Sequence, residues 1–388
     1  MKAGTPPARD GLPLFWLALA VVFRFAALVL WLGLAAFLAV LGLGIFLGMD
    51  SPANFSIWAI PFLAGIVTAL YAVLKGACTL LISPSLSEKG VRLSMGRYPS
   101  LRGLIGEVAR RLGSRLPDHV VLGMSGDFYV FQGRMRLSPS TRLKGRILVL
   151  GAPLLYMLGA DELKSFLAHE LAHFTGGDGL YSAHVAPVYE SARAALNTLL
   201  EEFDEGTQSA LAGWTRLAYI PAIVVAFIYF KGFELIDARL RRSRELRADR
   251  LACEAYGPDI CASALVRGVG YGPIWDRLIA QPASDLSLLI AEDAPKAGLS
   301  RLSQHLSRHC SLAEQMVVGA LLVPTQALDT HPALRDRLLA LNVSKVMIGN
   351  ILSREPEHTV EDDFSADEQT LVNLYAKTAW RGMRDVFR

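Results

Sequence analysis

Residues 161–174 read DELKSFLAHELAHF, and this stretch predicts a buried helix that carries two histidines. Its apolar residues recur every three or four positions, which places them on one face of a helix. Asp161 and Glu162 stand at the start, where the positive end of the helix dipole favours acidic side chains. The stretch therefore predicts a helix of the protein interior, from which the rest of the fold can be worked out.

His169 and His173 are four residues apart, so a helix points both imidazoles at one ion. Neutral imidazoles suit zinc, which lowers the pKa of a bound water molecule. Glu170 lies next along the same face, where a carboxylate can hold that water, take its proton and later give it to a leaving amine. The pattern predicts one Zn²⁺ per chain and hydrolysis of peptide bonds, with Glu170 as the catalytic residue. The plainer alternative is a helix whose two histidines only hydrogen-bond within a core.

A catalytic zinc site usually has three protein ligands and one water, so a third ligand is expected downstream. Residues 239–255 (RLRRSRELRADRLACEA) are helical in pattern, with Glu245 and Asp249 four residues apart on one face. We assign Glu245 to the metal and Asp249 to the free N–H of a zinc-bound histidine, whose tautomer it would fix. The alternative is that both acids only pair with arginines of their own helix.

These motifs, in this order, resemble the gluzincin membrane proteases of the HtpX and CAAX prenyl protease type. The resemblance rests on residues 169–173 (HELAH), on residues 243–250 (SRELRADR), which look like the family's Glu-x-x-x-Asp helix, and on His331 with the proline after it. It covers residues 101–338 and implies zinc, endopeptidase activity and a role in the quality control of membrane proteins. It also implies that His331 approaches the site and stabilises an oxyanion. The alternative is an exposed histidine at the start of a helix.

One segment departs from the family pattern. The family often has Asn-Ala-Phe on the strand before the active-site helix, and the nearest counterpart here is residues 126–129 (GDFY). Residues 146–151 (RILVLG) nevertheless predict a short buried strand that leads into the zinc helix. An edge strand at this place would hold a substrate backbone by strand addition.

The composition indicates that part of the chain lies in lipid. Hydrophobic residues make up 52% and charged residues only 19%, with a mean hydropathy of +0.34. A net charge of +3 is too small for a nucleic-acid surface, which excludes nucleic acid as a partner. The expected partners are protein or peptide substrates and the lipid bilayer, and the oligomeric state stays open. The four cysteines stand far apart and predict reduced thiols: Cys78, Cys253, Cys261 and Cys310.

The N-terminal region predicts two membrane-spanning helices. Residues 25–49 contain no charge and can cross a hydrocarbon core of about 30 Å; a cleavable signal peptide is the alternative. Residues 57–82 predict the return span, with Lys75 near one end. Basic residues flank the outer ends of this pair, whereas the link of residues 50–56 has none. The two spans predict a multi-pass integral membrane protein. The positive-inside rule predicts cytoplasmic termini and a cytoplasmic catalytic domain, in a bacterial inner membrane or on the equivalent face of another membrane.

A third apolar run, residues 217–230 (LAYIPAIVVAFIYF), is 14 residues long and short for a span. Because His173 and Glu245 must meet at one ion, the chain crosses the membrane an even number of times between them. We therefore expect a helical hairpin at about residues 184–236 that dips into the bilayer, lies on it or is buried in the protein. A hairpin that spans the membrane twice stays open.

The expected fold is mainly α-helical with a small β-sheet (α+β), a zincin-type metalloprotease core attached to an N-terminal transmembrane helical hairpin. The predicted parts are a cytoplasmic tail (1–12), a two-helix anchor (13–83), a protease domain (95–345) interrupted by the inserted hairpin, and a polar linker with a C-terminal helix (346–388). The expected function is zinc-dependent endopeptidase activity on membrane or membrane-proximal proteins. The alternatives are a catalytically idle scaffold that keeps its zinc, against which an intact Glu170 argues, and a processing protease for one lipidated peptide.

Overall fold

The computed structural model describes residues 11–48, 59–81, 86–138, 140–175, 178–205, 212–280, 310–329, 331–343, 348–354 and 362–386. The chain divides into two compact units, and each unit is built from two separate stretches of sequence. One comprises Met1–Pro84 and Leu180–Ala238, and the other comprises Ser85–Gly179 and Arg239–Arg388. Most of the predicted N-terminal tail, and residues 355–361 of the predicted linker, lie outside the described residues.

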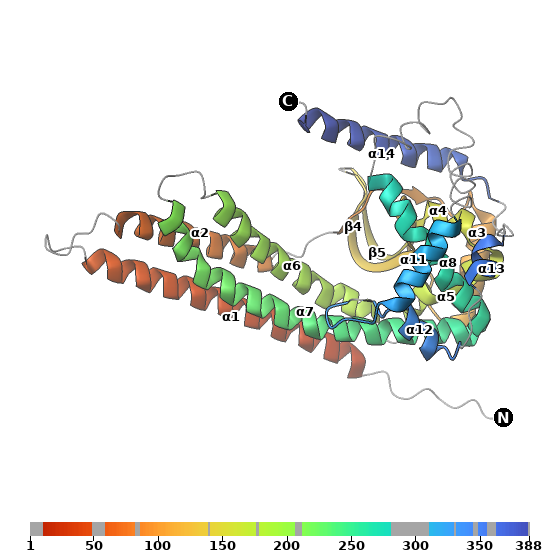
Figure 1. The fold of residues 1–388 in the computed structure, drawn as a ribbon, viewed down its shortest axis with the longest axis horizontal. Coiled ribbons are helices and arrows are strands. Elements are labelled where there is room, and N and C mark those ends of the chain that lie inside the picture. Colours follow the sequence, from red (N-terminus) through yellow and green to blue (C-terminus); the bar gives the residue numbers. More distant parts are fainter. Residues whose placement is uncertain are drawn as a thin grey trace. The chain divides into compact units, whose positions relative to one another are not determined.

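The first unit is a helical bundle, and we use that name for it below. It contains α1 (Gly11–Gly48), α2 (Ala59–Leu81), α6 (Asp178–Glu205) and the first part of α7 (Ala212–Tyr256), which Figure 1 shows as long helices. Its core consists largely of alanines around Trp31, and a side chain at Gly76 would collide with the indole of Trp31. Small residues of this kind let helices approach closely in a membrane. Large apolar side chains such as Phe25 and Ile228 point outward instead, with exposed fractions of 68% and 65%.

Helices α6 and α7 run antiparallel, because Phe203 faces Tyr219 near the connection and Tyr189 faces Phe230 further along both helices. The ring centroids of these pairs are 6.3 and 5.4 Å apart. Residues predicted as a separate anchor and as an inserted hairpin therefore share one apolar core. The small side chains with which α1 and α2 pack against each other also leave room for α6 and α7 to pack against them.

Within the part of the chain that the structure describes, two helices are long and apolar enough to cross a bilayer, Ala18–Gly48 within α1 and Tyr219–Tyr256 within α7. The apolar stretch of α2, Phe62–Cys78, is shorter. Helix α7 extends well beyond the run of residues 217–230, to a total of 45 residues. Lys231 does not end it, since the ammonium group pairs with Glu234 on the next turn at 2.6 Å.

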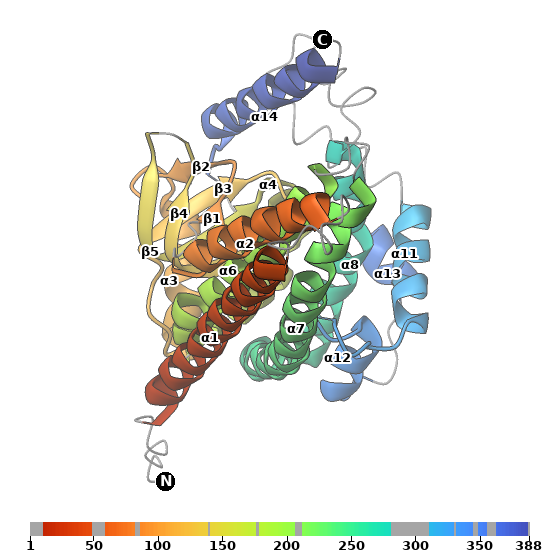
Figure 2. The ribbon, with the colours of Figure 1, turned by 90° about the vertical axis from the view of Figure 1, so that its left-hand side faces the viewer.

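The second unit, called the core unit below, contains a five-stranded sheet with the strand order β1-β4-β5-β3-β2 (Figure 2). The strands are β1 (Leu86–Ser87), β2 (Gly90–Leu93), β3 (His119–Gly123), β4 (Tyr129–Arg136) and β5 (Arg142–Gly151). Central β5 pairs with β3 in parallel and with β4 antiparallel, with Tyr129 opposite Val149. On its other side β4 pairs with β1 only at Met135 and Arg136. Among the described strands, the first six residues of β4 thus form an open edge.

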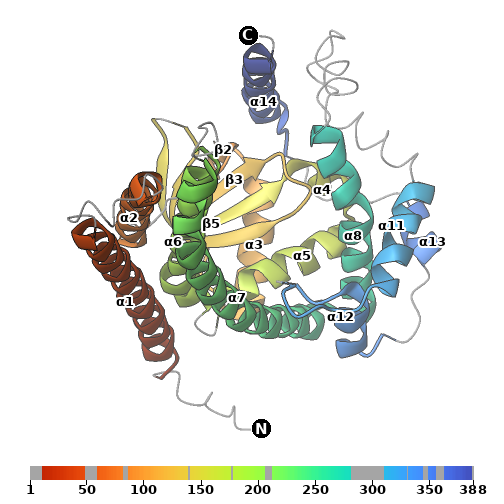
Figure 3. The same ribbon diagram turned by 60° about the vertical axis from the view of Figure 1, so that its left-hand side comes forward.

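Helices cover this sheet and complete the apolar core of the unit. They are α3 (Pro99–Leu112), α4 (Ala152–Met157), α5 (Ala160–Ala172), α8 (Pro258–Ala280), α11 (Cys310–Leu322), α12 (Leu334–Ala340), α13 (Ile348–Ser353) and α14 (Ser365–Val386). Helix α5 packs against α3 and α8, and α11 packs on α8 (Figure 3). Leu163, Leu167 and Leu171 form the buried face of α5, one helical turn apart. A mainly helical protein with one small sheet confirms the predicted α+β fold.

The strand predicted at residues 146–151 is the second half of β5, which begins earlier, at Arg142. The short helix α4 lies between this strand and α5. A side chain at Gly151, the end of β5, would collide with the carbonyl groups of Ser125 and Asp127. A side chain at Gly126 would collide in the same way with the backbone of Gly272 on α8. These two glycines therefore let the segment before β4 pass closely between β5 and α8, which fixes the position of Asp127.

Candidate metal centre

The start of α5 is fixed by Glu162, which accepts hydrogen bonds from two directions. The backbone N–H of Gly159 donates to Glu162 Oε2 at 2.8 Å, as in a capping box. The guanidinium of Arg267 on α8 lies 3.0 Å from the same carboxylate, and also donates to the carbonyl of Met157 at 3.1 Å. Since Arg267 is only 3% exposed, this ion pair holds the helix that carries both histidines in a defined position.

The end of α5 is held by α7. Arg247 donates to the carbonyl of Thr175 at 2.8 Å and to that of Ala172 at 3.3 Å. Both carbonyls lie at or just after the end of α5, where the helix dipole favours a cation. The carbonyl of Ala172 also accepts hydrogen bonds from the N–H and the hydroxyl of Thr175, at 2.9 and 2.7 Å. The two helices that supply the predicted ligands are therefore joined directly beside His173.

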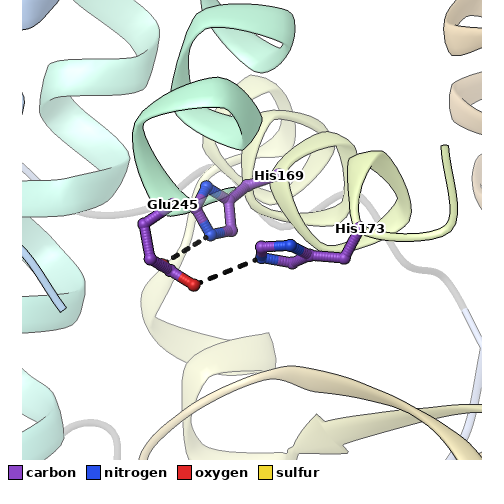
Figure 4. Close-up of side chains that lie close together, drawn as sticks. All are labelled: His169, His173 and Glu245. Carbon is purple, nitrogen blue, oxygen red and sulfur yellow. Dashed lines mark ion pairs between the residues drawn. The ribbon is translucent and has the colours of Figure 1, made fainter. Parts of the chain in front are cut away.

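His169 and His173 on α5 converge with Glu245 on α7 (Figure 4). His169 Nε2 lies 3.4 Å from Glu245 Oε2, and His173 Nε2 lies 3.5 Å from Glu245 Oε1. The three donor atoms lie within 4.8 Å of one another. Among the residues that the structure describes, this is the one group of three or more His, Cys, Asp or Glu side chains close enough to hold a metal ion.

Two imidazoles and one carboxylate are the donor set of many catalytic zinc sites. The donor atoms of the three groups lie close together, and a divalent cation stabilises such an arrangement. Their burial supports it further, since His173 and Glu245 are each 9% exposed. The residues present therefore fit a zinc ion.

Asp249 connects the site to a residue that the sequence did not single out. Asp249 Oδ1 lies 2.8 Å from His169 Nδ1, and the carboxylate accepts hydrogen bonds from Arg337 Nε at 2.7 Å and Nη2 at 2.6 Å. The contact turns His169 Nε2 toward Glu245. Arg337 lies 88 residues from Asp249, and no spacing rule in the sequence predicts a pair at that separation.

Burial and neighbouring charges shift the protonation of the histidine and of the acid beside it. Burial lowers the pKa of His169, but Asp249 and Glu245 outweigh burial and raise it to about 10. Zinc binds the neutral ring, so a zinc ion held here would displace this proton. Glu170 Oε1 lies 3.9 Å from His169 Nε2. Burial raises the pKa of Glu170 to about 8, and a bound cation opposes that rise.

Two residues from other elements complete the surroundings. His331, between α11 and α12, places Nδ1 3.1 Å from Glu245 Oε2, while its side chain is 65% exposed. Burial raises the pKa of Asp127, whereas the N–H of Phe128 and the charges of His331 and His169 oppose that rise. Asp127 belongs to the segment in which the sequence departs from the family pattern.

The structure brings together every residue predicted for the site: His169, Glu170, His173, Glu245, Asp249 and His331. Sequence reasoning did not find Arg247 or Arg337. Arg247 donates to a backbone carbonyl, and Arg337 donates to the carboxylate of Asp249, which lies far away in the sequence. Cys78, Cys253 and Cys261 are free thiols outside this group.

Comparison with known proteins places these residues within one family of peptidases. A model described as peptidase family M48 matches residues 107–344, more than half of the chain. "Protease HtpX" of Chromohalobacter salexigens is 22% identical over 171 residues, which cover 42% of this chain and 53% of that protein. "Protease HtpX homolog" of Archaeoglobus fulgidus is 24% identical over 211 residues, 53% of this chain and 58% of that protein.

A third relative, "Protease HtpX" of Shewanella pealeana, is 25% identical over 213 residues, 51% of this chain and 72% of that protein. The chain thus spans little more than half the length of the first two relatives. No solved structure matches it significantly.

Proposed function

This chain belongs to peptidase family M48, and on that premise we propose that it is a membrane-bound zinc endopeptidase. The observation that carries the proposal is the convergence of His169, His173 and Glu245 from two helices, with Glu170 beside them. Zinc, when bound there, supplies a Lewis acid and lowers the pKa of water to about 7. The three converging residues hold the metal, one ion per chain.

The remaining chemistry belongs to side chains of the site. Glu170 acts as general base toward the attacking water and then passes the proton to the leaving amine. Asp249 keeps His169 in the tautomer that binds metal through Nε2. His331, exposed beside Glu245, donates a hydrogen bond to the oxyanion that forms at the peptide carbonyl.

The open edge of β4 supports an extended peptide as the substrate. Its backbone N–H and C=O groups are available to a further strand, and the edge begins at Tyr129, two residues after Asp127. A substrate held by its backbone needs an unfolded segment and little sequence specificity. This fits quality control of membrane or membrane-proximal proteins.

The proposed location is a membrane that the chain crosses more than once, with the core unit in the cytoplasm. Helices α1 and α7 supply apolar stretches of sufficient length. Since α6 and α7 form a hairpin between His173 and Glu245, either both cross or neither does. The basic flanks of the N-terminal helices favour the cytoplasmic side for both ends of that region.

Measuring metal content and activity on the same samples tests the proposal. We expect about one zinc per chain and casein cleavage in the detergent-purified wild type, and loss of both in Glu245→Ala. Asp259→Ala, an exposed acid at the start of α8, serves as a control that keeps both. Full zinc occupancy and activity in Glu245→Ala would refute the ligand assignment. Zinc with no cleavage of any protein would favour the idle scaffold, and cleavage at one motif only would favour the processing protease.

A further inference from the structure

We propose that Arg242 is a positioning residue that holds the His331 loop, defined here as residues 323–329 and 331–333, in place beside the metal centre. The inference rests on the proposed role of His331 and adds to it a second residue that sets where His331 lies. Arg242 and Glu245 are three residues apart on α7, so they share one face of that helix. Arg242 therefore contacts the loop from a position on α7 next to Glu245, the third predicted ligand.

Arg242 donates to three backbone carbonyls of this loop. Its Nη1 lies 2.8 Å from the oxygen of Asp329, 2.9 Å from that of Ala327 and 3.3 Å from that of Gln326. Three carbonyls that converge on one guanidinium nitrogen fix both the distance and the orientation of the loop relative to α7. Hydrogen bonds from a charged donor are stronger than those between neutral groups.

The loop itself is built to present these carbonyls together. The N–H of Gln326 donates to Asp329 Oδ2 at 2.7 Å, and the N–H of Asp329 donates back to the carbonyl of Gln326 at 3.3 Å. On the other side of His331, the N–H of Ala333 donates to Thr325 Oγ1 at 2.7 Å. Hydrogen bonds thus link residues on both sides of His331 to one another, so a contact with one described part of the loop also acts on the other.

His331 is bracketed by two arginine contacts to α7. Arg242 holds the chain before it, and Arg337 on α12 holds the chain after it through the carboxylate of Asp249. Without such contacts an imidazole that is 65% exposed would sample many positions. With them its Nδ1 stays within 3.1 Å of Glu245, where a donor placed in advance stabilises a developing charge.

Loss of Arg242 is expected to affect the order of the loop and not the folding of the protein. Gln326 and Ala327 are exposed, so water can replace the guanidinium at their carbonyls. Loss of Arg242 is expected to lower the activity, because a displacement of about 1 Å at a reacting group can reduce the rate by a factor of about 100.

The test compares Arg242→Ala, His331→Ala and the double variant, with kcat, KM and zinc content measured on a fluorogenic peptide substrate. We expect Arg242→Ala to keep zinc and KM and to lower kcat about tenfold or more. In the His331→Ala background the same change has no further effect, since the residue through which it acts is gone. Arg242→Lys restores part of kcat because an ammonium reaches fewer carbonyls than a guanidinium. Arg239→Ala, an exposed arginine on the preceding turn, is the matched control without effect.

Three results would overturn the inference: wild-type kcat in Arg242→Ala, a kcat loss that adds fully to that of His331→Ala, or wild-type kcat in His331→Ala. None of these results bears on the assignment of the zinc ligands. The metal content of Glu245→Ala tests that assignment separately. Hydrogen exchange gives a second readout, in which residues 323–329 exchange faster in Arg242→Ala than in Arg239→Ala.

Discussion

The carboxylate of Asp249 contacts two groups at once. One oxygen lies beside Nδ1 of His169, and the other accepts a hydrogen bond from the guanidinium of Arg337. Replacing Asp249 with Asn keeps the shape of the side chain but removes the charge that orients the imidazole. We expect Asp249→Asn to weaken zinc binding about 10- to 100-fold, measured by competition with a chromophoric chelator. Asp259→Asn, on an exposed turn, is the control, and equal zinc affinity in both variants would contradict the role of Asp249.

Glu170 is the residue whose change separates metal binding from chemistry. Glu170→Gln keeps the volume and the contacts of the side chain but cannot take up a proton. We expect zinc to be retained and kcat to fall about 100- to 10,000-fold, the range that a general base contributes. Peptide cleavage by the zinc-loaded variant measures this, and a rate near that of the wild type would remove Glu170 from the mechanism.

The sequence predicted residues that are close in the chain better than residues that meet through the fold. His169, Glu170 and His173 follow from the four-residue spacing of one helix, which is local information. Glu245 and Asp249 required a search for a missing ligand, which their own four-residue spacing guided. Arg337 escaped because its partner lies 88 residues away.

At the scale of elements, the position of α5 depends on the ion pair at its start. Removing Arg267 leaves Glu162 partly buried without its cation, and breaking a buried pair in this way costs about 3–5 kcal/mol. We expect Arg267→Met to lower the free energy of unfolding by about 3 kcal/mol in denaturant titrations. Arg250→Met, on an exposed site of α7, is the control, and the double variant Glu162→Gln with Arg267→Met recovers part of the loss.

Helix α14 lies beyond the region that the family model matches, yet it belongs to the core unit. Phe364, just before the helix, stacks on Tyr98 at 4.7 Å, and Leu371 is fully buried in the apolar core. Asp362 accepts the N–H of Leu101 at 2.7 Å and so completes the start of α3. The sequence predicted a C-terminal helix here but could not predict that it docks, because its partners are residues of α3 and the sheet.

The docking of α14 can be tested at one position. Leu371→Ala removes a buried side chain, and we expect it to lower the free energy of unfolding by about 3 kcal/mol. Asn373→Ala, on the exposed side of the same helix, leaves it within about 0.5 kcal/mol. Equal stability of both variants would mean that α14 is not part of the core unit.

At the scale of the whole molecule, all predicted zinc ligands belong to the core unit and none to the helical bundle. A ligand that binds only the folded form stabilises the unit that holds it. Calorimetry in detergent is therefore expected to resolve two transitions, of which a chelator lowers only that of the core unit. The chelator has no effect on Glu245→Ala, and a shift of both transitions to the same extent would contradict two separate units.

The insertion of α6 and α7 between His173 and Glu245 also governs when the site can form. While the ribosome makes the chain, the two histidines leave the exit tunnel first, and the third ligand follows only after a pair of long helices has been synthesised. Until then the nascent protein holds two of the three predicted ligands and lacks His331 as well. Under the proposed function, a growing chain is therefore inert toward other polypeptides, and it gains the proposed peptidase activity only once α6 and α7 have been made.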